Sequence, residues 1–167
     1  MRGAGYGRPV ATLSGLCVLA PPTDLAERLS RVALVIDGDP APAGPLWLEL
    51  SGDDDVFDVA ATITRATGSP VFAFLGQRTA GVVAVEEHAA AERVSAIALS
   101  DAGWSVEPPG TLGAREWHAE LVGAGAVDGA FDRLQALMER TRRRCAVSAS
   151  CRRAGWLDRL RRGVAPR

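Results

Sequence analysis

Three apolar runs follow one another in the stretch Val71–Ser100, VFAFLGQRTAGVVAVEEHAAAERVSAIALS. Only short polar breaks separate the runs VFAFLG, AGVVAVEEH and RVSAIALS. Such breaks suit tight turns and are too short for the crossover that must connect two parallel strands. The stretch therefore predicts three consecutive antiparallel strands.

A helix is predicted directly before these strands, in residues 51–70, SGDDDVFDVAATITRATGSP. Ser51 or Asp53 can cap its beginning, and Gly68 followed by Pro70 can end it. One stripe at helical spacing is formed by Val56, Ala60, Ile63 and Thr67. This stripe gives the helix one face to bury against the strands.

Two further strands and one helix are predicted on the amino-terminal side. Val10–Leu19 and Leu46–Leu50 have the composition of strands, and in LWLEL every second residue is a leucine. Between them, Asp24–Leu34 has apolar residues at helical spacing, although its end, VALVID, could equally form a strand. Residues 1–9 are rich in glycine and are expected to be flexible.

The carboxyl-terminal side offers one more helix. It can be capped by Asp128, and its apolar face consists of Phe131, Leu134, Leu137 and Met138. Residues 105–127 are irregular apart from a short candidate strand in REWHAEL, residues 115–121. The order β-α-β-α-β-β-β-α predicts a single small α+β domain over residues 10–139, with a mixed sheet of about five strands and helices largely on one face.

An arginine-rich tail is predicted to follow this domain, in residues 140–167. The chain has nineteen cationic residues, all of them arginine as in the products of GC-rich genomes, and ten lie in this tail beside a single acid, Asp158. The tail thus has a formal charge of +9 and the preceding residues −10, which points to an anionic partner for the tail. The acidic domain could itself be that partner. One side of a basic amphipathic helix would carry Trp156, Leu157, Leu160 and Val164.

A non-catalytic protein-interaction module is the leading functional hypothesis. No phosphate-binding loop or nucleophile motif is present, and no cofactor is expected. The most specific form is an inhibitor, immunity or regulatory protein with an acidic binding face, because complementary charge accelerates and orients association. The candidate contacts are Asp53, Asp54, Asp55, Glu86 and Glu87 in the acidic face and Arg142, Arg143, Arg144, Trp156, Arg161 and Arg162 in the tail.

The aspartates of this face also have a purely structural explanation. Asp53, Asp54, Asp55 and Asp58 lie where the second helix is predicted to begin. Carboxylates at that end of a helix offset its dipole by roughly 0.3 to 1 kcal/mol each. Their spacing does not match a calcium-binding loop.

A metal-dependent hydrolase is the alternative from a different functional class. The two histidines, His88 and His118, each stand beside carboxylates, in EEH and EWHAE. If both segments are extended, Glu86 shares a face with His88, while Glu116 and Glu120 share a face with His118. Two such faces in contact would suit Zn or Fe and could activate a water.

A third hypothesis makes the tail an adaptor that binds nucleic acid or an anionic membrane. Its arginines would contact phosphates, or Trp156 would enter the lipid. An exposed edge of the sheet could in addition support a homodimer.

The three cysteines do not form a recognisable framework. Their number is odd, and Cys145 and Cys151 have a C-x5-C spacing that is not a zinc signature, so a reducing compartment and a cytoplasmic localisation are expected. Cys17 lies in an apolar run and is expected to be a small core residue. Neighbouring arginines should favour the thiolates of the other two, which leaves a redox-responsive tail open.

Overall fold

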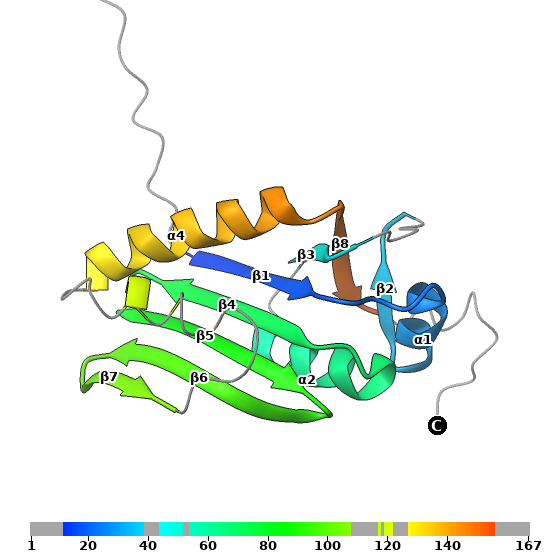
Figure 1. Ribbon diagram of the computed structural model, residues 1–167, viewed down its shortest axis with the longest axis horizontal. Helices are drawn as coiled ribbons and strands as arrows, with labels where there is room; N and C mark the ends of the chain where they lie inside the picture. Colours follow the sequence, from blue (N-terminus) through cyan, green and yellow to red (C-terminus); the bar gives the residue numbers. More distant parts are fainter. Residues whose placement is uncertain are drawn as a thin grey trace, which may run out of the picture.

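Eight strands form one mixed sheet in the part of the chain that the structure describes. A computed structural model of the chain describes residues 12–38, 44–51, 54–107, 117, 119–121 and 127–155. The strands lie in the order β2-β8-β3-β1-β4-β5-β6-β7, and every neighbouring pair is antiparallel except β3 and β8 (Figure 1). Their bounds are β1 Thr12–Val18, β2 Leu34–Ile36, β3 Leu46–Leu50, β4 Val71–Gln77, β5 Val82–Ala89, β6 Glu92–Ser100, β7 Gly103–Val106 and β8 Val147–Arg153.

The three antiparallel strands expected in Val71–Ser100 are confirmed as β4, β5 and β6. Phe74 pairs with Val85, and Val85 pairs with Ile97, so one face of this part of the sheet is apolar. An irregularity in the β5–β6 pairing falls between Glu87 and His88. The α+β class is thus confirmed.

The expected number of about five strands is wrong, because β2, β7 and β8 also join the sheet. β2 has three residues and lies within VALVID, the segment for which the sequence left a strand open as an alternative to the helix end. Ala33, with a φ of 59°, separates the two elements. β7 lies in a segment that was expected to be irregular, where only Trp104 and Val106 suggest a strand.

The expected helical tail is correct over residues 140–144 and wrong over residues 147–153, which form a strand. Residues 140–144 are the last part of helix α4, Val127–Arg144, and β8 follows almost at once. β8 lies inside the sheet, with Cys151 paired to Ile36 of β2 and to Leu50 of β3. Arg140 itself lies within α4, and residues 156–167 lie outside the described residues.

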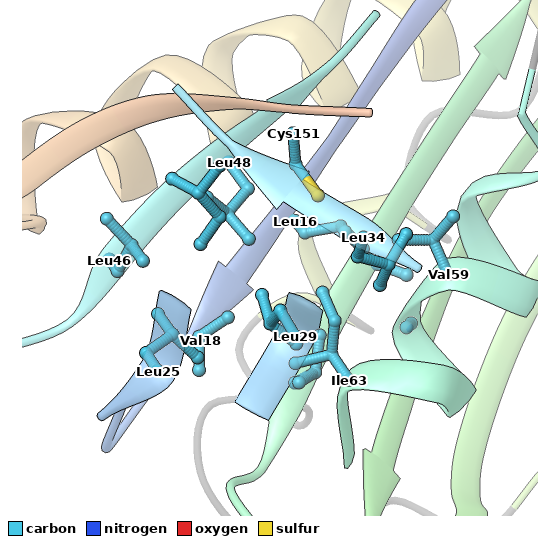
Figure 2. Close-up of a cluster of buried hydrophobic side chains, with 14 of the residues drawn as sticks. Leu16, Val18, Leu25, Leu29, Leu34, Leu46, Leu48, Val59, Ile63 and Cys151 are labelled. Atoms are coloured by element: carbon cyan, nitrogen blue, oxygen red, sulfur yellow. The ribbon is translucent and has the colours of Figure 1, made fainter. Parts of the chain in front are cut away.

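Helices cover both faces of the sheet, whereas the sequence suggested one. Helices α1, Leu25–Arg31, and α2, Val56–Thr67, pack on the first face, and α4 packs on the second. We call these the α2 face and the α4 face. Figure 2 shows the core under the α2 face, where side chains from both helices and from β1, β2, β3 and β8 point toward one another. This core includes Leu16, Val18, Leu25, Leu29, Leu34, Leu46, Leu48, Val59, Ile63 and Cys151.

The α4 face has a second core with more aromatic side chains. The predicted apolar side of α4 is confirmed, and Asp128, expected to be the cap, lies within the helix. Leu134 packs on Gly76 so closely that a Cβ there would lie 2.9 Å from a leucine methyl. The Arg78 guanidinium lies 4.3 Å from the centre of the Phe131 ring and forms ion pairs with Asp128 and Asp132 at 3.1 and 3.0 Å.

Trp117 closes part of the same core. Its ring centre lies 4.2 Å from that of Phe72. The strand expected in residues 115–121 is a misassignment, since the described residues 117 and 119–121 are helical. None of the helices in the described ranges has the length and apolar character needed to cross a membrane.

Candidate functional site

An open cavity of about 450 Å³ lies on the α2 face, where α2 begins beside β1 and β4. We call it the acidic cavity. Two carboxylates, two hydroxyls and one amide line it together with apolar side chains, and no cation is found among its described lining residues. The lining residues are Thr12, Ser14, Asp54, Asp55, Val56, Phe57, Leu75 and Gln77.

Strand pairing places the polar groups of this cavity side by side. Thr12 pairs with Gln77 and Ser14 with Leu75 across β1 and β4. Because side chains alternate along a strand, these residues lie on the same face as the buried Leu16. Thr12 is exposed and Ser14 is half-buried, so this end of the α2 face is open to solvent.

Asp55 caps α2. Its Oδ1 accepts bonds from the backbone N–H groups of Phe57 at 2.9 Å and Asp58 at 3.4 Å. The cap was expected at Ser51 or Asp53, but Ser51 is outside the helix start and Asp53 lies outside the described residues. Both capping bonds end on one oxygen, so Oδ2 of Asp55 keeps its capacity to accept bonds.

Two other aspartates of the run hold an arginine of β8. Asp54 forms an ion pair with Arg153, whose Nε lies 3.2 Å away, and accepts a hydrogen bond from the backbone N–H of Arg153 at 3.3 Å. Asp58 forms an ion pair with the same guanidinium. Asp55 and Asp58 lie at the start of α2, as the helix-dipole explanation requires, whereas the pairing of Asp54 with Arg153 was not expected.

Glu86 and His88 share the α2 face, as expected from an extended segment. The His88 Nε2 lies 2.8 Å from a Glu86 oxygen, and both side chains are largely buried. The other Glu86 oxygen accepts a bond from Arg93 at 3.3 Å, and Arg93 also pairs with Glu107 of the β7 edge. This acid is therefore already engaged with its neighbours.

Glu87 does not belong to an exposed acidic face, which corrects its assignment as a partner contact. Only 1% of its surface is exposed, and it pairs across the sheet with Phe72 on the α4 face. The Ser95 hydroxyl donates to its carboxylate at 3.0 Å. The alternation along β5 turns Glu87 to the side opposite Glu86.

The described members of the predicted metal site do not all meet, because Glu120 lies apart from Glu86 and His88. Glu120 binds Arg140 of α4 at 2.5 Å, and this hydrogen bond raises the pKa of Arg140. It thus lies on the α4 side of the sheet, whereas Glu86 and His88 point to the α2 face. Glu116 and His118 lie outside the described residues, and within the described ranges no group of three His, Cys, Asp or Glu could hold a metal ion.

Several arginines of the predicted tail contact acids of the preceding domain. Arg142 pairs with Glu49 of β3 at 2.8 Å, in addition to the Arg140 and Arg153 pairs. Arg143 and Arg144 are exposed at the end of α4. The remaining predicted contacts, Trp156, Arg161 and Arg162, lie outside the described residues.

Sequence reasoning missed the uncharged side of the acidic cavity. Thr12, Ser14 and Gln77 have no motif around them, and their shared position follows from the β1–β4 register. A signal was present in β1, where Thr12 and Ser14 continue the alternation of Leu16 and Val18 with polar residues. Such a switch marks the point where a buried face becomes solvent-exposed.

Comparisons of the chain with protein-family models, with curated proteins and with solved structures give no match.

Proposed function

We propose that this protein is a non-catalytic interaction module that binds a basic segment of a partner protein in the acidic cavity. The observation that carries the proposal is the acidic composition of the cavity, in which Asp55 keeps one carboxylate oxygen available. Asp54 also lines the cavity and is already paired with Arg153, which is not among the described lining residues. An inhibitory or regulatory role would follow from covering the partner's basic surface.

An arginine side chain of the partner matches the groups in the cavity. A guanidinium has five N–H donors, and carboxylate, hydroxyl and amide oxygens are its acceptors. The free Oδ2 of Asp55 supplies the charged acceptor, and Ser14 and Gln77 supply neutral ones. Phe57 adds an aromatic side chain on which a guanidinium can stack.

Peptide titration tests the proposal. Isotope-labelled full-length protein is titrated with a short arginine-containing peptide and with the same peptide containing citrulline, which keeps the shape and removes the charge. We expect the amide signals of Thr12, Ser14 and Gln77 to shift with the arginine peptide only. Higher salt should weaken the binding because the interaction is between charges.

A matched pair of variants assigns the binding to the cavity. Asp55→Asn keeps a good capping residue and removes the charge, so affinity should fall roughly fivefold. Asp58→Asn makes the same charge change outside the cavity and should leave affinity unchanged. Equal effects of the two variants, or shifts spread over the whole acidic surface, would mean that the cavity is not the binding site.

A further inference from the structure

Cys17 and Cys145 lie next to each other on the α4 face, although 128 positions separate them in the sequence. Their sulfur atoms are 3.7 Å apart. Cys17 is the last residue but one of β1 and is 2% exposed, whereas Cys145 directly follows α4 and is partly accessible. The accessible sulfur is therefore in the connection between α4 and β8.

The hydrogen bonds of the pair give the two thiols different acidities. Cys145 can donate its S–H to the backbone oxygen of Thr141, 3.2 Å away, and Cys17 can donate to the Cys145 sulfur. The hydrogen bond from Cys17 lowers the pKa of Cys145, against the effect of burial. The same hydrogen bond and burial raise the pKa of Cys17. Cys145 is thus the sulfur that becomes a thiolate first.

The third cysteine has a different environment. Cys151 is fully buried in the core under the α2 face, on the other side of the sheet. Burial and the charges of Asp54 and Asp37 raise its pKa to about 11. It is neither accessible nor placed to reach Cys17.

We propose that Cys17 and Cys145 are a reversible redox pair in which Cys145 reacts first with a hydroperoxide and Cys17 then closes a disulfide. In the first step, written for hydrogen peroxide, the Cys145 thiolate attacks one peroxide oxygen, the O–O bond breaks, and a sulfenic acid and hydroxide form. In the second step the Cys17 sulfur attacks the sulfenic sulfur, the S–O bond breaks, and the proton of Cys17 leaves with the hydroxyl as water. The hydroxide takes up the proton that Cys145 released on ionisation, so two thiols are oxidised and one hydrogen peroxide is reduced to two waters.

Closure of the disulfide requires the sulfurs to approach from 3.7 Å to a bond length of about 2.0 Å. β1 is held on both sides by β3 and β4, so Cys17 stays in place. Cys145, which lies between α4 and β8, is therefore the residue that has to move toward Cys17. The product would tie the α4–β8 connection to the centre of the sheet.

Peptide mapping after mild oxidation tests the proposal. The folded full-length protein is treated with one equivalent of hydrogen peroxide, its remaining thiols are alkylated, and it is digested. We expect a Cys17–Cys145 linkage with the loss of two hydrogen atoms, an alkylated Cys151, and recovery of all three thiols after reduction. Trypsin leaves Cys145 and Cys151 on one peptide because no arginine separates them, so fragmentation of that peptide locates the bond.

Single-cysteine variants give the second readout. Cys17→Ala should stop the reaction at the sulfenic acid of Cys145, which a dimedone probe traps, and Cys145→Ala should give neither product. Cys151→Ala should form the linkage as the unmodified protein does, and circular dichroism checks the fold of each variant. Two free or over-oxidised thiols at positions 17 and 145 in the unmodified protein, or a linkage to Cys151, would overturn the proposal.

Discussion

At the scale of single residues, the consecutive aspartates before α2 have separate roles. Asp55 binds backbone N–H groups of the helix, while Asp54 binds Arg153 of a distant strand. The sequence predicts correctly that acids gather at this helix start. It does not predict which of them is the cap, because that depends on where the backbone turns from extended to helical conformation.

The cap can be tested by Asp55→Ala. We expect the free energy of unfolding to fall by about 1 kcal/mol, because two backbone N–H groups at the start of α2 lose their acceptor. Urea denaturation measures the change. Asp55→Asn, which can accept the same bonds, should be close to the unmodified protein, and an equal loss in both variants would show that charge rather than capping is responsible.

The neighbouring acids of β5 show the limit of residue-level prediction. That Glu86 and His88 share a face follows from the period of a strand and could be predicted. Whether the Glu87 side chain is buried depends on the distant residues that pack beside it, such as Phe72. The local sequence of β5 does not contain this information.

The acidity of Cys145 predicts a pH-dependent reactivity. A lowered pKa means that its thiolate, the reactive form, appears at a lower pH than in an ordinary cysteine. The rate of alkylation of Cys145 by iodoacetamide should therefore rise at lower pH than the rate for unfolded protein. In Cys17→Ala the rise should move to higher pH because the donor S–H is gone. Identical profiles with and without Cys17 would contradict this assignment.

At the scale of elements, β8 is the strand that the sequence conceals. Its inward residues Val147, Ala149 and Cys151 are small, and the adjacent arginines give the segment the composition of a basic tail. Helix α4 was predictable because its apolar stripe is long and regular. A short strand with small inward residues has no comparable signal, and its place in the sheet is set by distant partners.

Truncation measures the contribution of β8. A chain ending at Arg144 loses the strand between β2 and β3, and we expect its free energy of unfolding to fall by at least ~3 kcal/mol, since a buried core residue and two strand pairings disappear together. A chain ending at Gly155 keeps all eight strands and is the matched comparison. Equal denaturation curves for the two truncations would contradict the central position of β8.

At the scale of the whole molecule, local and distant pairings differ in how far they could be predicted. The pairs β4–β5 and β5–β6 follow from short turns, and the sequence predicted them correctly. The parallel pair β3–β8 joins segments just over a hundred residues apart, as in Leu46 and Val147, which no local pattern encodes. The acidic cavity has the same origin, because Asp55 was predicted as a contact while Ser14 and Gln77 join it only through the folded sheet.

Oxidation of the thiol pair should stabilise the molecule as a whole. A bond between Cys17 and Cys145 closes most of the chain into one loop, and the entropy lost by the unfolded chain corresponds to roughly 4 to 5 kcal/mol, less any strain in the folded state. We expect the oxidised protein to unfold at a higher denaturant concentration than the reduced protein. Cys17→Ala should show no such difference between oxidising and reducing conditions.

The position of β8 also has a consequence for the order in which the chain can fold during its synthesis. β8 is the last of the eight strands to leave the ribosome, yet it occupies a place between two strands made long before it. Until it arrives, β2 has no described strand partner and the outer edge of β3 is unpaired. An exposed edge of this kind can pair with other chains, and pairing between distant segments is slow. The nascent chain therefore passes through a period in which one side of its sheet is complete from β3 to β7 and the other side is open to association.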